Sequence, residues 1–298
     1  MALSCVRPLE GYRAPGGRFT YDVKASVGGQ HLTLRCGQCI NCRLRRRFEW
    51  AMRLAHETTM HAENSFITLT YADGMLPVHG SLVLSHFQDF MKRLRSRLSP
   101  RRIRYFQCGE YGGETGRPHY HAIIFGYGFP DRVLYQQKEG GSLYVSRFLD
   151  SVWDNGISTI GDVTFDSASY VAGYVTKKIT GEAASDAYWS LDERTGELHQ
   201  VCEEYARCSV RPAIGIPWLE RHWRDVYPAD RCPIPFKRIL GPVPRAYDRW
   251  LQKEKPKLWA SVRKARIHND GPDWSGPDFR SIEKVARAQL ELKSRRRL

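Results

Sequence analysis

The run Arg117–Gly126, Arg-Pro-His-Tyr-His-Ala-Ile-Ile-Phe-Gly, constrains the fold of this chain more than any other segment. We interpret its central part, from His119 to Phe125, as a β-strand. Alternate side chains of a strand share one face, so His119 and His121 project together. Two imidazoles placed this way are close enough to hold one divalent cation. The opposite face is expected to pack inward and consists of Tyr120, Ala122 and Ile124.

A carboxylate precedes the two histidines at a spacing that fits a hairpin. The segment from Ile103 to Cys108 is predicted to be a strand, and glycines 112, 113 and 116 punctuate the connection that follows. Glu110 would then lie beside His119, with Glu114 as the second choice. A hard cation such as Mg²⁺ or Mn²⁺ prefers a carboxylate ligand. His119, His121 and Glu110 are therefore predicted to form a metal site, and two ordinary histidines on a sheet face are the alternative.

Two tyrosines follow in a helical pattern. Tyr170 and Tyr174 are four residues apart and lie on one face of a helix expected over residues 167–179. Lys177 and Lys178 fall close to the same face, which favours an exposed reactive ridge over tyrosines packed in a core. A phenol that attacks a phosphodiester forms a covalent phosphotyrosine, and a lysine can steady the developing charge. Two tyrosines would allow two successive strand transfers.

The cysteines near the N-terminus have the spacing of a metal site. Cys36, Cys39 and Cys42 are each separated by two residues, and Cys5 is available as a fourth ligand. Four thiolates around Zn²⁺ would fasten an otherwise loop-rich segment. An iron–sulfur cluster uses similar spacing, but nothing else in the sequence points to electron transfer. Unliganded thiols are the other alternative.

The charge of the chain favours a nucleic-acid partner. The 298 residues include 46 Lys and Arg against 32 Asp and Glu, a net charge of +14. Such an excess favours a polyanion, whose binding is driven by counterion release. A basic protein without such a partner is the alternative. Three clusters could contact phosphates or form solvated helix faces: Arg43, Arg45, Arg46 and Arg47; Lys92, Arg93, Arg95 and Arg97; Arg101, Arg102 and Arg104.

The alternation of elements predicts an α+β fold, an antiparallel sheet with helices packed on one face. Residues 66–71 and about 157–164 read as further strands, whereas 43–61, 85–98 and 146–153 read as helices. We expect a Cys-rich segment and basic helix over 1–60 and the α+β core over 61–182. Residues 183–298 are expected to form an irregular Pro-rich accessory region with a basic helical tail.

The sequence predicts a protein of the cytoplasm. No segment approaches the ~18 consecutive apolar residues that span a bilayer, and the N-terminus lacks the apolar region of a secretory signal. The eight cysteines are then expected to be thiols or metal ligands and not disulfides.

Three motifs, in this order, resemble those of the HUH-family replication initiators of gokushovirus-like microviruses, which are small single-stranded DNA bacteriophages. They are Phe-Ile-Thr-Leu-Thr-Tyr at 66–71, Arg-Pro-His-Tyr-His at 117–121 and Tyr-Val-Ala-Gly-Tyr-Val-Thr-Lys-Lys at 170–178. Similarity extends to the cysteine run with residues 43–45, to 211–215 and to 242–248, so it covers nearly the whole chain.

The resemblance implies an HUH endonuclease with an RRM-like palm that acts in rolling-circle replication. Such an enzyme nicks origin single-stranded DNA, keeps a 5′-phosphotyrosine link and later closes the circle, with Mg²⁺ or Mn²⁺ as cofactor. It would work in the cytoplasm of the bacterial host. The sequence has no Gly-x₄-Gly-Lys-Ser/Thr loop, so a host helicase and replication machinery are expected partners.

Two other functions stay open. One is a different HUH enzyme, such as a plasmid-type replication protein or a relaxase. The second is a non-catalytic nucleic-acid-binding protein with a structural zinc site. That protein would bind DNA in a salt-dependent way without cleaving it.

Overall fold

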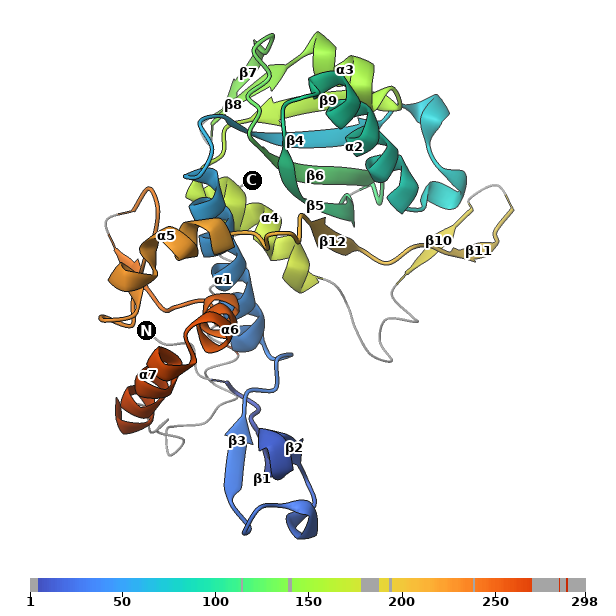
Figure 1. Cartoon of the computed structure of the whole chain (residues 1–298). Helices are drawn as coiled ribbons and strands as arrows, with labels where there is room; N and C mark the ends of the chain where they lie inside the picture. The colour runs from blue at the N-terminus through green and yellow to red at the C-terminus, as the bar shows by residue number, and fades with distance from the viewer. Residues whose placement is uncertain are drawn as a thin grey trace. The chain divides into compact units, whose positions relative to one another are not determined.

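In the computed structural model, a seven-stranded antiparallel sheet carries the two histidines. Its order is β12-β5-β6-β4-β9-β8-β7 (Figure 1). The α+β prediction is confirmed. The strands are β4 (Asn64–Tyr71), β5 (Arg104–Tyr111), β6 (Pro118–Phe125), β7 (Val133–Lys138), β8 (Gly141–Val145), β9 (Gly156–Gly161) and β12 (Tyr205–Cys208).

The structure describes residues 5–113, 115–138, 141–177, 188–192, 195–237 and 239–269, and residues 284 and 288. The chain forms two units, one from residues 1–47 and 263–298 and the other from 48–262. The predicted functional division into 1–60, 61–182 and 183–298 stays a prediction. None of the described helices combines the length and the apolar character that crossing a lipid bilayer requires.

Helices cover both faces of the large sheet, and not one face as predicted. The reason lies in strand β6, where Tyr120 and Ile124 on one face and Ile123 and Phe125 on the other are all fully buried. The helices are α1 (Ile40–Thr58), α2 (Leu84–Leu98), α3 (Arg147–Trp153), α4 (Phe165–Lys177), α5 (Ile216–Val226), α6 (Arg245–Glu254) and α7 (Pro256–Asn269).

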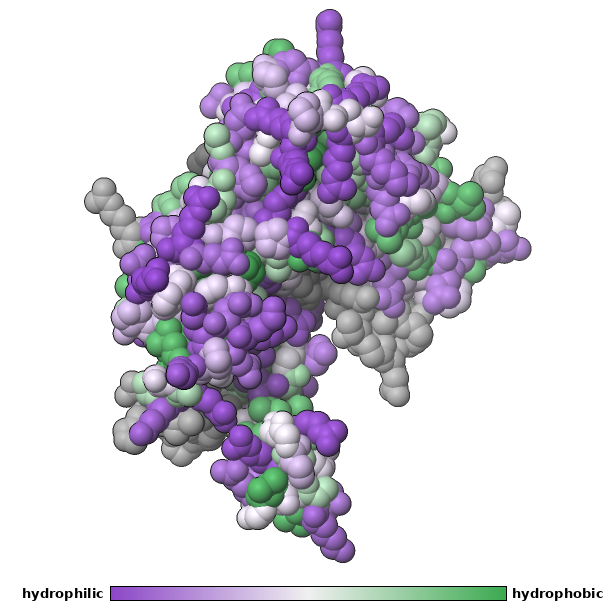
Figure 2. Space-filling view, viewed as in Figure 1, coloured by the Kyte–Doolittle hydropathy of each residue, from purple (hydrophilic) through white to green (hydrophobic). Residues whose placement is uncertain are grey.

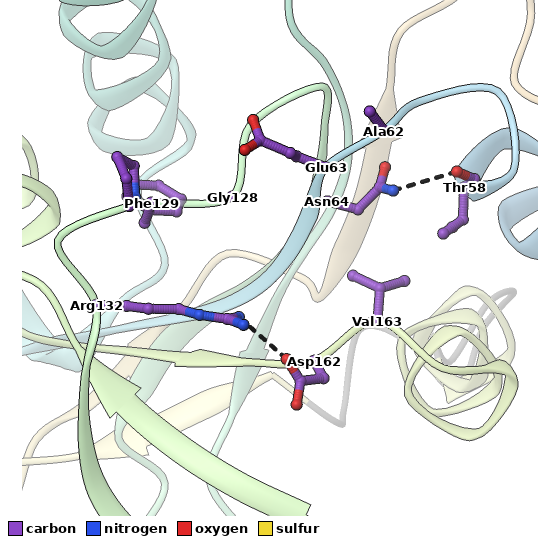
Figure 3. A pocket seen from close by; sticks show the side chains of 10 residues that line it. Thr58, Ala62, Glu63, Asn64, Gly128, Phe129, Arg132, Asp162 and Val163 are labelled. Atoms are coloured by element: carbon purple, nitrogen blue, oxygen red, sulfur yellow. Dashed lines mark hydrogen bonds and ion pairs between the residues drawn. The ribbon is translucent and has the colours of Figure 1, made fainter.

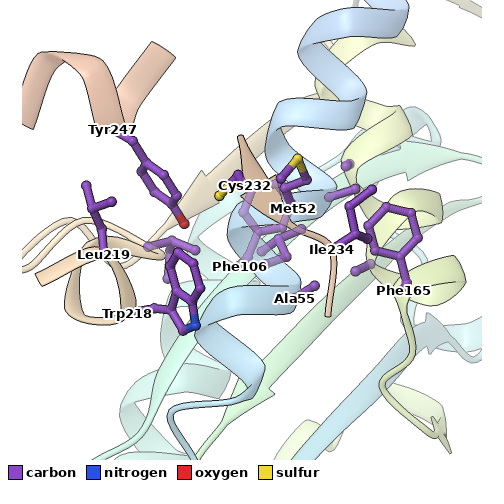
Figure 4. Close-up of a cluster of buried hydrophobic side chains, with 14 of the residues drawn as sticks. Met52, Ala55, Phe106, Phe165, Trp218, Leu219, Cys232, Ile234 and Tyr247 are labelled. Carbon is purple, nitrogen blue, oxygen red and sulfur yellow. The ribbon is translucent and has the colours of Figure 1, made fainter. Parts of the chain in front are cut away.

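Each face of the sheet has its own apolar core. Helices α2 and α3 pack on the face of Tyr120, where Phe90 and Trp153 are fully buried. On the other face, α1 and α4 join α5 and α6 around side chains such as Met52 and Phe106 (Figure 4). The histidine face is thus partly covered by helices, and α4 is the helix that carries the two tyrosines.

The helix carrying the tyrosines begins earlier than the sequence predicts. The pattern favours Asp166 or Ser167 as the cap, but α4 begins at Phe165. Thr164 and Ser167 cap it reciprocally: the Ser167 amide donates to Thr164 Oγ1 at 3.1 Å and the Thr164 amide donates to Ser167 Oγ at 2.7 Å. Each hydroxyl satisfies a backbone donor, which fixes where the helix starts.

The region after residue 183 is more ordered than its prolines predicted. β12 pairs with β5 and extends the central sheet at one edge. Prolines begin helices in this region, since Pro217 lies in the first turn of α5 and Pro256 is the first residue of α7. A proline at this position loses no helical hydrogen bond, so it starts a helix without breaking it. Two small hairpins complete the region: β10 (Trp189–Leu191) with β11 (Leu198–Gln200), and β13 (Cys232–Pro233) with β14 (Leu240–Gly241).

The N-terminal unit contains a small antiparallel sheet in the order β2-β1-β3, where the sequence predicted loops. Its strands are β1 (Leu9–Arg13), β2 (Phe19–Thr20) and β3 (His31–Leu34). Its buried apolar cluster consists of Val6 and the three cysteines Cys5, Cys39 and Cys42. So small a cluster gives little hydrophobic stabilisation, and a domain of this size ordinarily needs a metal or disulfides.

Candidate active site

Glu110, His119 and His121 converge on one point of the central sheet. The register of β5 and β6 sets Glu110 directly opposite His119. Glu110 Oε1 lies 2.8 Å from His119 Nε2 and 2.9 Å from His121 Nε2. The carboxylate is 4% exposed, and the two imidazoles are 17% and 8% exposed. Three ligand atoms within reach of one cation, largely shielded from solvent, make this a candidate metal site.

Backbone and side-chain contacts orient both imidazoles. His119 Nδ1 donates to the carbonyl oxygen of Arg117 at 3.0 Å, because a carbonyl can only accept. Its Nε2 therefore faces Glu110 and, in the neutral ring, carries a lone pair suited to a metal. His121 Nδ1 is 2.9 Å from Thr68 Oγ1. Sequence reasoning missed Thr68, although alternation along residues 66–71 points its side chain toward the histidines.

His121 is held between two aromatic rings. The ring of Phe66 stacks on it with centroids 5.6 Å apart, and the ring of Tyr174 also stacks at 5.6 Å. Tyr170 meets His121 edge-on at 5.4 Å. The sheet and α4 thereby bring both predicted tyrosines to the metal-site candidate. Phe66 was in a quoted motif, but its packing role was not foreseen.

The two tyrosines differ in exposure. Tyr170 is 41% exposed, whereas Tyr174 is 4% exposed. The interpretation of the pair as an exposed ridge is therefore wrong for Tyr174, because α4 turns this side chain onto the sheet. Burial raises the pKa of Tyr174, and the negative charge of Glu110 raises it further. Burial also raises the pKa of Tyr170, opposed by a hydrogen bond with Tyr174. Both phenols are neutral in this arrangement.

Three predicted residues have no described side chain. Lys177 is the last residue of α4, but its side chain lies outside the described part of the structure. Lys178 and Glu114 lie outside the described residues altogether. Their predicted roles stay predictions.

The four N-terminal cysteines also converge. The sulfur atoms of Cys5, Cys36, Cys39 and Cys42 lie within 4.8 Å of one another. Cys5 Sγ is 3.5 Å from Cys36 Sγ and 3.8 Å from Cys39 Sγ. Tetrahedral Zn²⁺ with Zn–S bonds of ~2.3 Å separates its sulfur ligands by about 3.8 Å. The cluster therefore fits a zinc ion in both ligand type and spacing.

Backbone amides donate to two of the sulfurs, as they do around metal-bound thiolates. The Cys36 amide donates to Cys5 Sγ and the Cys39 amide to Cys36 Sγ, both at 3.3 Å. Burial alone would raise the pKa of Cys36, but amide donors, Cys39 first, lower it to about 7. Burial raises the pKa of Cys42 to about 12. The site thus already favours one thiolate.

Comparison with known proteins places this chain among phage replication proteins. It is 33% identical to the replication-associated protein VP4 of Bdellovibrio phage phiMH2K over 266 residues, covering 86% of this chain and 80% of the relative. The chain belongs to the replication-associated proteins of microvirus-like phages. Identity to the replication-associated protein ORF2 of Spiroplasma virus 4 is 29% over 276 residues, covering 85% of this chain and 81% of that protein. The motif-based resemblance to microvirus replication proteins is confirmed.

A third relative and a family profile locate the similarity. The chain is 33% identical to the replication-associated protein ORF4 of Chlamydia phage 1 over 171 residues, covering 54% of this chain and 42% of that protein. The profile of the family described as replication-associated protein ORF2 matches residues 64–179. This span runs from the first residue of β4 past the end of α4, so it includes both histidines and both tyrosines. No solved structure matches the chain.

The arginines that this replication protein carries between residues 93 and 104 make contacts within the protein. Arg93 pairs with Asp154 and Arg101 with Glu63. Arg104 reaches the fully buried carboxylate of Glu57, with Arg104 Nη1 2.7 Å from Glu57 Oε1. These side chains hold elements together, which weakens the prediction that this stretch is a main DNA-binding surface.

A polar pocket of about 440 Å³ lies at the other end of the central strands (Figure 3). Asn64, the first residue of β4, lines it, and Arg132 pairs with Asp162 across it at 3.0 Å. Neither histidine nor either tyrosine contributes to its lining. The pocket's charged groups neutralise each other, and we place the chemistry at the histidine cluster.

Proposed function

We propose that this replication-associated protein is a metal-dependent DNA endonuclease and strand transferase that starts rolling-circle replication of a phage genome. One observation carries the proposal: two tyrosines pack directly against the histidine of a Glu–His–His cluster. A metal ligand set beside a nucleophile is the arrangement that phosphoryl transfer needs. The family profile covers all five residues.

Glu110, His119 and His121 are the proposed ligands of the divalent cation. Their donor set of two imidazole nitrogens and one carboxylate suits Mn²⁺ better than Mg²⁺, which prefers oxygen ligands. When bound, the cation would polarise the scissile phosphate and offset the negative charge of Glu110 beside the tyrosines. Thr68 and the Arg117 carbonyl keep the imidazoles in position for this role.

Tyr170 is the proposed nucleophile of the first strand cleavage. It is the tyrosine that an incoming DNA strand can reach, with 41% of its surface exposed. Tyr174, 4% exposed and stacked on His121, is proposed to act second, in the rejoining transfer. Lys177 or Lys178 is proposed to steady a phosphate oxygen.

Bonds and protons balance without any further reagent. The phenol oxygen forms a bond to phosphorus while the bond between phosphorus and the 3′-oxygen breaks. The phenol proton passes to solvent, and the leaving 3′-oxygen takes up a proton. The 5′-phosphate stays on the tyrosine, so a later 3′-hydroxyl can attack it and rejoin the strand.

The test is a nicking assay with Mn²⁺ and labelled single-stranded origin DNA. We expect Tyr170→Phe to abolish the covalent adduct and Tyr174→Phe to permit a first adduct but impair joining. Tyr135→Phe is the matched control, since Tyr135 is 68% exposed on β7. An adduct that persists in the double variant Tyr170→Phe/Tyr174→Phe would overturn the nucleophile assignment.

The cysteine cluster is proposed to hold a structural Zn²⁺. Four sulfurs complete a tetrahedral site and leave no open position for a substrate. The cluster also keeps alive a second function, a zinc-containing nucleic-acid-binding protein without catalysis. That protein would bind the same oligonucleotide in a salt-dependent way and leave it uncut at every Mn²⁺ concentration.

Strand unwinding is proposed to depend on partners. Single-stranded origin DNA is the proposed substrate, and a host helicase with the replication machinery in the bacterial cytoplasm is proposed to supply the unwound strand.

A further inference from the structure

Half of the protein's excess positive charge lies in its first 47 residues. Residues 5–47 contain nine Lys and Arg against two Asp and Glu, a net charge of +7. The remaining 251 residues, 48–298, contain 37 against 30, which is also +7. Four thiolates on one Zn²⁺ would lower the N-terminal figure by two. The N-terminal unit thus has a charge density several times that of the rest of the chain.

Aromatic side chains lie among these cations. Tyr21 is 68% exposed, and its ring meets that of Phe19 edge-on with centroids 4.9 Å apart. Arg18 and Lys24 flank the two rings in sequence, and both are exposed. Arg13 lies opposite Phe19 in the pairing of β1 with β2. Over these strands, Figure 2 shows apolar and pale side chains among hydrophilic ones.

One face of the small sheet presents apolar side chains to solvent. Leu9 of β1 and Leu34 of β3 pair directly, and each is 37% exposed. Phe19 shares this face, because its ring reaches within 2.6 Å of where a Cβ on Gly11 would stand. Only glycine at position 11 lets the Phe19 ring lie against the strand. The unit therefore combines cations with an apolar, aromatic surface.

We infer that the N-terminal unit, residues 5–47, is a binding surface for single-stranded DNA, separate from the histidine cluster. Cations track the phosphates of a single strand, and exposed rings stack on its unpaired bases. Duplex DNA hides the faces of its bases, so exposed Phe19 and Tyr21 favour an unpaired strand. The inference deepens the proposed function and rests on it, because it concerns where the same DNA is held.

The test measures binding of full-length protein carrying Tyr170→Phe/Tyr174→Phe, so that no covalent product forms. A labelled single strand of about 20 nucleotides, long enough for one or more single-strand sites, is titrated by fluorescence anisotropy at several KCl concentrations, without added Mn²⁺ and without chelator. We expect Tyr21→Ala to weaken binding roughly 5- to 100-fold, the range for loss of one base stack. Arg18→Gln/Lys24→Gln should lower the slope of log K against log salt by about 1.4, two single-strand phosphate contacts.

Matched variants in the other unit separate specific loss from general loss. Tyr135→Ala removes an equally exposed ring, and Lys253→Gln/Lys257→Gln removes the same charge from exposed positions. Zinc content and circular dichroism check that each variant is folded. Equal effects of test and control variants, or tighter binding of a duplex of the same sequence, would overturn the inference.

Nicking by the same substitutions in a protein with both tyrosines distinguishes the two proposals. If Tyr21→Ala nicks normally at saturating DNA but binds weakly, the N-terminal surface is supported along with the catalytic site. If wild-type protein binds through the N-terminal unit and never nicks, the proposed function fails and the DNA-binding surface stands.

Discussion

The Glu–His–His cluster and the four-cysteine cluster are both built for a metal, but the protein forms them in opposite ways. Glu110 and His119 are placed by the pairing of β5 and β6, strands that run between two apolar cores. The cysteines lie around Val6 in a unit whose buried apolar cluster is little more than the cysteines themselves.

The difference indicates what each metal is for. A sheet that is held by its own core has its ligands in place before a cation binds, so the cation can serve the reaction. A unit without such a core depends on the metal for its fold. The account therefore predicts that removing one metal stops chemistry and removing the other unfolds a unit.

The largest effect is expected at the cysteines. Cys39→Ser should abolish zinc binding, whose free energy in small zinc domains is on the order of 10 kcal/mol. Residues 5–47 should then become sensitive to limited proteolysis, while urea unfolding of residues 48–262 keeps its midpoint. Cys202→Ser, an exposed cysteine outside the cluster, is the control. An intact N-terminal unit in zinc-free Cys39→Ser would break the comparison.

The next effect is expected at the histidine cluster. His119→Ala should lower the rate of single-strand cleavage on the order of 10³-fold, which corresponds to several kcal/mol of lost charge stabilisation. The melting temperature should change little, because this side chain lies at the site and not in a core. His79→Ala, outside the cluster, should cleave normally. A collapse of folding in His119→Ala would show that the site is structural.

Acid should weaken the sheet unit through one buried histidine. His56 is fully buried, and burial lowers its pKa to about 4, opposed by a hydrogen bond to the Pro233 carbonyl. The unfolded chain binds a proton near pH 6.5 and the folded chain does not, so stability is full above pH 6.5 and falls toward pH 4. The loss should reach about 3 kcal/mol.

Urea unfolding of residues 48–262 at neutral pH and at a pH just above the pKa of folded His56 measures this loss. His56→Gln should remove most of the pH dependence, whereas the exposed His31→Gln should keep it. An unchanged pH profile in His56→Gln would place the acid sensitivity elsewhere.

The smallest effect is expected at Thr68. Its hydroxyl contacts His121 Nδ1, and loss of such an outer contact typically weakens metal binding roughly 10- to 100-fold. Thr68→Val should show this loss in a Mn²⁺ titration followed by electron paramagnetic resonance, and Thr68→Ser should restore affinity. Equal affinity of Thr68→Val and wild type would remove Thr68 from the site.

Local pattern predicted the parts of the site but not their surroundings. Alternation placed His119 and His121 on one face, and a short hairpin was enough to set Glu110 beside them. Helical spacing placed Tyr170 and Tyr174 together, but spacing does not say what a helix face packs against. The burial of Tyr174 on His121 depends on how α4 lies on the sheet, which only long-range packing determines.

The fold was predictable to the same depth. The strands at 66–71 and 119–125 were found within a few residues, because their apolar and β-branched pattern is local. The membership of β12 in the sheet was not, since its partner β5 lies about 100 residues earlier in the chain. The helices after residue 215 were missed because prolines that begin helices were interpreted as breakers.

The central claim is that a tyrosine held against the Glu–His–His cluster attacks DNA. Its most direct measurement is mass mapping of the peptide that carries nucleotide after full-length protein reacts with Mn²⁺ and single-stranded origin DNA. The account predicts a 5′-phosphonucleotide on Tyr170 that is absent without Mn²⁺ and absent in His119→Ala. A nucleotide attached outside Tyr170 and Tyr174, or an adduct that forms without the metal, would contradict it.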